Sequence, residues 1–315
     1  WQADDLYESA DSWYRRTLSF NKDESTPVTF LYFDGVYMDC DILLNGQVIY
    51  THPYGYTSFY VAMTDLLREG DNELMVHIRH QSPNSRWYSG SGIYRDVYLM
   101  TVPADHMIPD SISIEETDGE KGIRKITVRT ETAGLRQQAF HCTLTDDSGN
   151  VVAEADGTSK QGISSAALVV HQAHLWSPDD PYLYTLIIQY GKQTEVRKIG
   201  LRSVVLHPDE GFILNGHKIK LKGVCLHHDL GALGAAYHQK AARRQLELMK
   251  QMGANAVRTS HNPPASQFLD LCDEMGFLVV DEAFDMWERS KTTYDYARFF
   301  DLWVKKDVAA WVRRD

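Results

Sequence analysis

The pattern of the sequence changes at residue 206, and this change limits the folds that the chain can adopt. Before that point, short apolar or alternating stretches are separated by turn residues, which is typical of antiparallel strands. Beyond it, strand-like stretches alternate with helical stretches at 238–252, 263–275 and 296–314. This alternation predicts a parallel sheet, because parallel neighbours need a crossover connection.

The predicted parallel segment is too short to close a barrel. A complete barrel of eight strand–helix units needs about 250 residues, whereas about 110 follow residue 205. The alternative is an open doubly wound sheet, which usually carries a glycine-rich phosphate loop after its first strand. The turn here, residues 227–231, reads His-His-Asp-Leu-Gly and has no GxGxxG pattern. We therefore favour the first βα units of an incomplete (β/α)8 TIM barrel.

The residues before 206 divide into two β-rich parts. In residues 1–101, the dipeptide Asn45-Gly46 lies between two apolar stretches, which is the strongest short-range signal of a hairpin. Many short strands with turn signals favour a sandwich or a jelly roll. Residues 102–205 have the strand spacing and the length of an immunoglobulin-like β-sandwich, without the Cys…Trp…Cys pattern of antibody domains.

Charge and cysteine use exclude several kinds of partner. The net charge of −11 argues against nucleic acid and anionic membrane surfaces, because both attract basic proteins. No apolar run reaches the roughly 18 residues of a membrane span.

The motifs of two other hydrolase classes and of zinc sites are absent from the sequence. Neither the GxSxG elbow of serine hydrolases nor the HExxH motif of metalloproteases occurs. No CxxC pair occurs, so we expect free thiols rather than a zinc site at Cys40, Cys142, Cys225 and Cys272.

Polar and aromatic residues follow each predicted parallel strand. In a barrel, side chains at the carboxyl ends of the strands meet at one mouth, where active sites lie. A carbohydrate site needs hydrogen-bonding groups for hydroxyls, carboxylates for the glycosidic bond, and an aromatic surface for the C–H face of the sugar. The three strand ends supply such a set: first His227, His228 and Asp229, then Arg258, His261 and Asn262, and last Asp281, Glu282, Asp285 and Trp287.

Several of these residues also fit a structural role. His227 and His228 could cap a strand, contact a sugar, or form half of a metal site with Asp229. His261 could simply hold its loop. Arg258 is as well suited to orienting a carboxylate as to touching a substrate.

The acidic pair after the third strand cannot both face the cavity. Asp281 and Glu282 are adjacent, and neighbouring side chains of a strand point to opposite sides. From the residues alone, Glu282 would be the candidate general acid. Trp287 could be a core residue or a sugar platform, and Asp96 could form an ion pair with Arg95.

Taken together, several stretches resemble glycoside hydrolase family 2, the family of β-galactosidases, β-glucuronidases and β-mannosidases. Residues 90–97 (GSGIYRDV) resemble the end of its N-terminal sugar-binding jelly roll, and residues 176–184 resemble its immunoglobulin-like domain. Residues 215–227, 255–263 (NAVRTSHNP) and 280–284 (VDEAF) resemble its barrel signatures. The resemblance covers nearly the whole chain and implies a jelly roll at 1–101, a sandwich at 102–205 and a partial TIM barrel at 206–315.

The resemblance also implies where the catalytic groups lie. The acid/base glutamate of an Asn-Glu dipeptide and the nucleophilic glutamate would both follow Asp315, so Glu282 would be a supporting carboxylate. His227 and His261 would contact the sugar and stabilise its charged transition state, and Asp96 would reach the active site from the first domain. Further substrate contacts are expected from Asn262, Asp285 and Trp287, with Arg258 and Asp281 in support.

No cofactor is required according to the resemblance, although some relatives use magnesium or sodium. Some bacterial β-galactosidases bind magnesium through a glutamate near the loop that reads Phe-Asp-Met-Trp here, at 284–287, so we expect no metal site in this chain. Residues 12–15 resemble a stretch normally reached after several tens of residues, so we expect the front of the jelly roll to be missing. Residues 1–5 contain no start methionine and do not resemble a signal peptide.

The expected full-length protein is a retaining glycosidase that removes terminal β-linked sugars, with β-galactosides favoured. Two carboxyl groups about 5 Å apart would act through a covalent intermediate, and this chain alone should be inactive. A β-glucuronidase or β-mannosidase, a non-catalytic carbohydrate-binding module and a scaffold remain as alternatives. The expected partner is a carbohydrate. Whether the protein forms a homo-oligomer is left open. A cytoplasmic location is favoured, with periplasmic and secreted forms also open.

Overall fold

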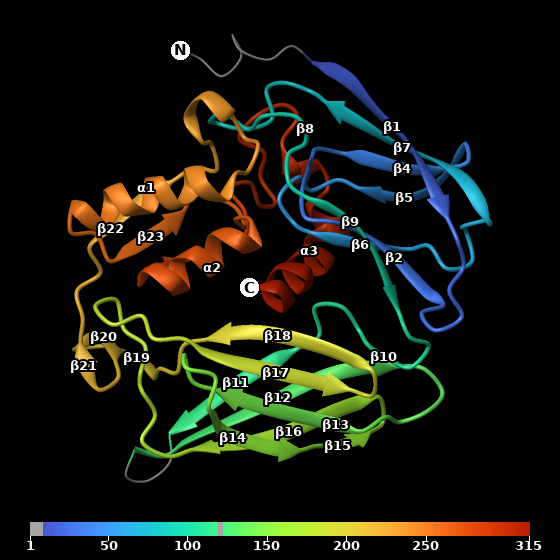
Figure 1. Cartoon of the computed structure of the whole chain (residues 1–315). Coiled ribbons are helices and arrows are strands. Elements are labelled where there is room, and N and C mark those ends of the chain that lie inside the picture. Colours follow the sequence, from blue (N-terminus) through green and yellow to red (C-terminus); the bar gives the residue numbers. More distant parts are fainter. Residues whose placement is uncertain (1–8, 119–121) are drawn as a thin grey trace.

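The computed structural model describes residues 9–118 and 122–315 and shows three parts along the chain (Figure 1). Two β-rich parts come first, and helices joined to parallel strands follow. This is the predicted combination of a jelly roll, an immunoglobulin-like sandwich and the first units of a TIM barrel. The predicted domain limits at residues 101 and 205 stay predictions, and the expectation about residues 1–5 lies outside the described part.

The jelly roll is built from antiparallel strands whose side chains alternate between core and surface. Strand β7 shows this best, because every second residue from Asn72 to His80 is buried. The predicted hairpin is present, and both of its turn residues have the positive φ that this turn requires, 49° at Asn45 and 83° at Gly46. The sheets are β1 (Ala10–Phe20), β7 (Gly70–His80), β4 (Cys40–Leu44) and β5 (Gln47–His52); β6 (Phe59–Ala62), β2 (Val28–Phe33) and β9 (Val97–Val102); and β3 (Val36–Tyr37) with β8 (Gly92–Ile93).

The sandwich packs two antiparallel sheets face to face. Its core is formed by inward-facing apolar residues of both sheets, among them Ile126, Leu144, Leu168 and Ile188. One sheet contains β10 (His106–Met107), β11 (Ser113–Asp118), β12 (Arg124–Ala133), β16 (Ile163–Val170) and β15 (Thr158–Lys160), and the other contains β14 (Val151–Asp156), β13 (Phe140–Thr145), β17 (Tyr184–Tyr190) and β18 (Gln193–Ile199).

Three parallel strands, β22 (Gly223–Leu226), β23 (Ala256–Thr259) and β24 (Leu278–Val280), form the start of the barrel. Helix α1 (Gln239–Gln251) joins the first two strands and α2 (Ser266–Met275) joins the last two. The first parallel strand begins only at Gly223. The chain first forms a small antiparallel sheet of β19 (Val204–His207), β20 (Gly211–Leu214) and β21 (His217–Lys218), closed by a glycine turn at Asn215-Gly216.

The helix predicted at 296–314 is divided in two. A 3-10 turn, η4 (Tyr296–Arg298), comes first because the Asp295 carboxylate accepts the Ala297 amide and caps it. Helix α3 (Phe300–Arg314) then runs beside the jelly roll. Another 3-10 turn, η3 (Gly231–Leu233), lies between β22 and α1.

An aromatic interface joins the jelly roll to the barrel segment. Tyr54 packs against Phe284 and Tyr296, and its hydroxyl donates to the Ala283 carbonyl at 2.6 Å. This interface places a jelly-roll loop, residues 84–90, next to the ends of the parallel strands. Within the described residues, no helix is long and apolar enough to cross a membrane. All four cysteines are free thiols, with Cys225 exposed.

Candidate functional site

Three residues that follow the three parallel strands meet at one rim. His227 follows β22, His261 follows β23 and Glu282 follows β24. The two imidazole rings lie 5.8 Å apart and nearly perpendicular. The Nδ1 atom of His261 lies 2.8 Å from Oε2 of Glu282. The parallel register of the strands therefore brings together residues that are separated by up to 55 positions in the chain, from 227 to 282.

Arg258 completes the group around Glu282. Its Nε donates to Oε1 of Glu282 at 2.6 Å, while its Nη2 lies 3.1 Å from Nδ1 of His261. Nδ1 cannot accept from the guanidinium and donate to the carboxylate at once. The carboxylate contact is shorter and charge-assisted, so we assign the proton to Nδ1, which leaves Nε2 as an acceptor. This geometry suits Glu282 to orienting His261.

An aromatic residue from the jelly roll covers the histidine pair. Trp87 stacks on His227 with ring centroids 5.1 Å apart and an interplanar angle of 27°, and it meets His261 edge-on at 5.4 Å. Trp87 was not among the predicted site residues, because the prediction rested on the ends of the barrel strands. The available signal was a tryptophan in a turn-rich stretch, Pro-Asn-Ser-Arg-Trp, at 83–87.

Asp285 anchors the same jelly-roll loop through ion pairs. Its oxygens accept from Arg86 Nε at 2.8 Å and Arg86 Nη2 at 2.5 Å, and from Lys291 Nζ at 2.8 Å. Burial would raise the pKa of Asp285, which is 9% exposed, but the two cations hold it below its usual range. Its carboxylate is thus occupied by protein groups, and its predicted contact with a sugar stays untested.

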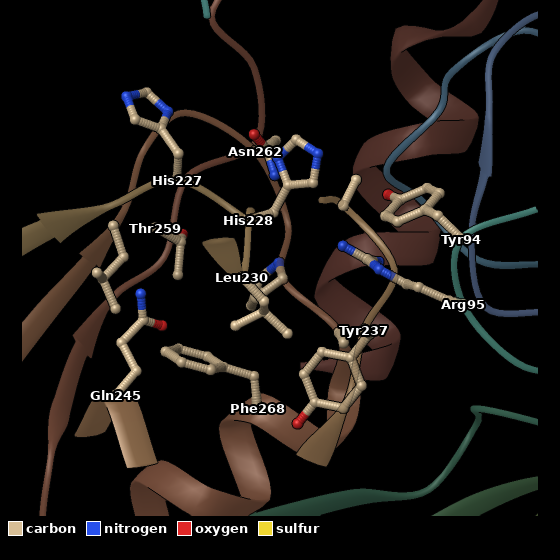
Figure 2. Close-up of a pocket in the computed structure, with 14 residues that line it drawn as sticks. Tyr94, Arg95, His227, His228, Leu230, Tyr237, Gln245, Thr259, Asn262 and Phe268 are labelled. Atoms are coloured by element: carbon tan, nitrogen blue, oxygen red, sulfur yellow. The ribbon is translucent and has the colours of Figure 1, made fainter. Parts of the chain in front are cut away.

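His228 and Asn262 lie behind this rim. Figure 2 shows the side chains of His227 and His228 pointing apart, with Asn262 near His228 on the wall of a pocket. His228 Nε2 donates to the Ser89 carbonyl at 2.8 Å, and burial lowers its pKa to about 4, so the ring is neutral. Of the roles left open for it, this geometry favours a structural one. Asn262, 3% exposed, is enclosed rather than presented at the mouth.

Asp281 points away from Glu282, as expected for adjacent residues. It accepts from Thr259 Oγ1 at 3.0 Å and from Trp311 Nε1 at 2.5 Å, and burial raises its pKa to about 6. These contacts fit a supporting role. Trp287 is 53% exposed and lies edge-on to Phe284, with ring centroids 5.4 Å apart.

The structure does not bring Asp96 to the rim. Its carboxylate accepts from Tyr98 Oη at 2.9 Å and from Gln267 Nε2 at 3.4 Å, which places it at the start of α2. The alternative ion pair with Arg95 is also not formed. Arg95 is 6% exposed, whereas Asp96 is exposed to solvent. The loop at 84–90, rather than Asp96, is the jelly-roll element that reaches the site.

Comparison with known proteins agrees with this arrangement of domains. A profile of the galactose-binding-like domain of glycosyl hydrolase family 2 matches residues 2–91, and the general profile of that family matches 111–202. The TIM barrel domain of the same family matches 205–294. The chain belongs to glycoside hydrolase family 2.

Similar members of this family have different names. The β-galactosidase BoGH2A of Bacteroides ovatus is 39% identical over 96% of this chain and 38% of its own length. A putative β-glucuronidase of Formosa agariphila is 36% identical over all of this chain and 31% of its own length. The crystal structure of a β-glycosidase from Bacteroides vulgatus, 34% identical, superposes with a TM-score of 0.93 over all of this chain and 42% of that one.

This family-2 chain thus spans less than half of the length of these relatives. Glycosidases of the family generally need no cofactor. Within residues 9–118 and 122–315, no group of three or more His, Cys, Asp or Glu side chains is placed to hold a metal ion.

Proposed function

We propose that the full-length protein is a retaining glycosidase that releases a terminal β-linked sugar, and that this chain forms the wall of its sugar pocket. The supporting observation is the meeting of His227, His261 and Glu282 at one rim beneath Trp87. The two catalytic glutamates belong to the part of the barrel that would follow Asp315.

Each rim group has a distinct task in this proposal. Trp87 presents an indole to the C–H face of the pyranose, and the histidines hydrogen-bond its hydroxyls. Burial and the nearby His261 lower the pKa of His227, so its imidazole is neutral at pH 7 and can accept or donate to a hydroxyl. Glu282 lies against His261 and orients its ring toward the sugar, whose developing positive charge a carboxylate at this rim would favour.

A β-galactoside is the favoured substrate, and a β-glucuronide is the second candidate. The sequence itself shows no obvious basic cluster for a sugar carboxylate. The fold, however, brings Arg86 and Lys291 together around the single carboxylate of Asp285, next to Trp87. One positive charge is therefore not balanced within this triad, and that charge supports the second candidate.

The test is an assay of the full-length protein on nitrophenyl β-glycosides. We expect release from β-galactoside with retained anomeric configuration by NMR, and slower release from β-glucuronide. No turnover on any sugar would contradict the proposed activity and leave carbohydrate binding alone, the function of a non-catalytic module. The oligomeric state and a cytoplasmic location stay proposals, to be tested by light scattering and fractionation.

A further inference from the structure

Two arginines from other parts of the chain, Arg95 and Arg314, hold the loop that carries His261. This loop joins β23 to α2 and contains Pro263 and Pro264, which have no amide hydrogen to donate. Their carbonyl groups are the anchors instead. Arg95 Nη2 donates to the Pro263 carbonyl at 2.8 Å, and Arg314 Nη2 donates to the Pro264 carbonyl at 2.6 Å.

Arg95 comes from the jelly roll and is fixed there as well. Its Nη1 donates to the carbonyl groups of Tyr56 at 3.1 Å and Asp34 at 3.4 Å, and its guanidinium lies 4.9 Å from the ring centre of Tyr94. Figure 2 shows it on the wall of the pocket that borders this loop. No carboxylate of the described residues lies within ion-pair distance of it, so carbonyl dipoles and one aromatic face stabilise this buried cation.

Arg314 approaches the loop from α3. Its side chain is 4% exposed, and it pairs with the Asp34 carboxylate at 3.5 Å and with Asp315 at 2.5 Å. Asp34 therefore connects both arginines, through its carbonyl to Arg95 and through its carboxylate to Arg314. The carbonyl groups of the two prolines therefore accept hydrogen bonds from two arginines on different elements, and both arginines contact Asp34 of the jelly roll.

We infer that Arg95 and Arg314 are positioning residues, which fix the loop so that the His261 ring stands between Glu282 and Trp87. This inference rests on the proposed function for its effect on catalysis. A shift of about 1 Å in a positioned group can lower a rate by about 100-fold. The jelly roll would thus act on the sugar pocket through the loop backbone, in addition to its direct contact through Trp87.

The test compares three variants of the full-length protein. Arg95→Met keeps the length of the side chain and removes its donors, and Arg95→Lys keeps the charge. Arg124→Met is the matched control, because Arg124 is also buried and ion-paired but lies in the sandwich. The readouts are the NMR resonances of the His261 ring and the Trp87 indole, and amide exchange at residues 259–262 and 265.

We expect Arg95→Met to shift the His261 and Trp87 resonances and to speed exchange in the loop by at least 10-fold, with partial rescue in Arg95→Lys. Arg124→Met should leave both readouts unchanged. Unchanged resonances in folded Arg95→Met, or equal changes in Arg124→Met, would overturn the inference.

Kinetics of the full-length enzyme form a separate arm. There Arg95→Met should lower kcat/KM by about 100-fold and Arg95→Lys by less. A wild-type enzyme without activity would refute the proposed function, while the NMR arm would still decide whether Arg95 positions the loop. Wild-type kcat/KM in Arg95→Met would contradict the positioning role.

Discussion

Trp87 and His261 illustrate which residues of the site could be predicted. His261 and Glu282 were predictable, because the ends of parallel strands share one edge and a local pattern reveals each strand. Trp87 and Arg86 were not, since no local pattern indicates which jelly-roll loop turns toward the barrel. The role of Asp96 stays a prediction, and the contacts of its carboxylate with Tyr98 and Gln267 could not be predicted from the local pattern either.

At the residue scale, Trp87→Ala should weaken sugar binding while the fold persists. The indole supplies stacking on His227, and aromatic contacts contribute about 1 kcal/mol beyond buried area. We expect the Kd of the matching monosaccharide, measured by calorimetry on the full-length protein, to rise by about 5- to 10-fold.

Trp13 provides the control for this variant. Like Trp87, it stacks on a histidine, His77, with ring centroids 4.0 Å apart. This pair lies on the jelly-roll strands β1 and β7 and not at the ends of the barrel strands. Trp13→Ala should therefore leave the Kd unchanged. An equal loss in both variants would mean that the effect of Trp87 is general destabilisation.

At the element scale, the sequence predicts turns and helix ends correctly where the residue at one position determines the backbone conformation. The hairpin at Asn45-Gly46 and the end of α2 at Gly276 were both readable, because positive φ favours glycine and asparagine. The short sheet of β19 to β21 was not predicted, since a weakly apolar stretch pairs there only in its tertiary context.

Gly276→Ala should destabilise the chain more than the same change at Gly253. Both have positive φ, 73° and 84°, which costs about 1 kcal/mol for alanine. At Gly276 a Cβ would also press on the Pro178 carbonyl oxygen of the sandwich, whereas nothing lies within 4 Å at Gly253. We expect a loss of about 2–4 kcal/mol for Gly276→Ala in urea unfolding. Equal losses would contradict the contact with Pro178.

At the scale of the whole molecule, a buried carboxylate joins the jelly roll to α3. Asp307 is 1% exposed, and its oxygens accept from Thr57 Oγ1 at 2.8 Å and from the Tyr296 hydroxyl. Burial raises its pKa to about 6, above the ordinary value of 3.8. The native state therefore binds a proton more tightly than the unfolded state does, and its stability falls as pH rises from 4 to 6.

Asp307→Asn should remove this pH dependence. A shift of about two pKa units corresponds to about 3 kcal/mol. The wild type should lose up to that much free energy of unfolding between pH 4 and pH 7 through this group, and the variant should not. The measurement is the free energy of unfolding against pH. Asp301→Asn, at an exposed position of the same helix, is the control. Parallel pH profiles for the Asp307→Asn variant and the wild type would contradict the assignment.

The loop at 84–90 has a consequence for how substrate preference can diverge in such proteins. It contacts His227 and Asp285, yet it belongs to neither the parallel strands nor the helices of the barrel segment. Under the proposed function, substitutions there can alter which glycan is accepted, while the core between the parallel strands, α1 and α2, which contains no residue of this loop, keeps its packing. Exchanging this short segment between relatives is accordingly a direct route to redesigning selectivity.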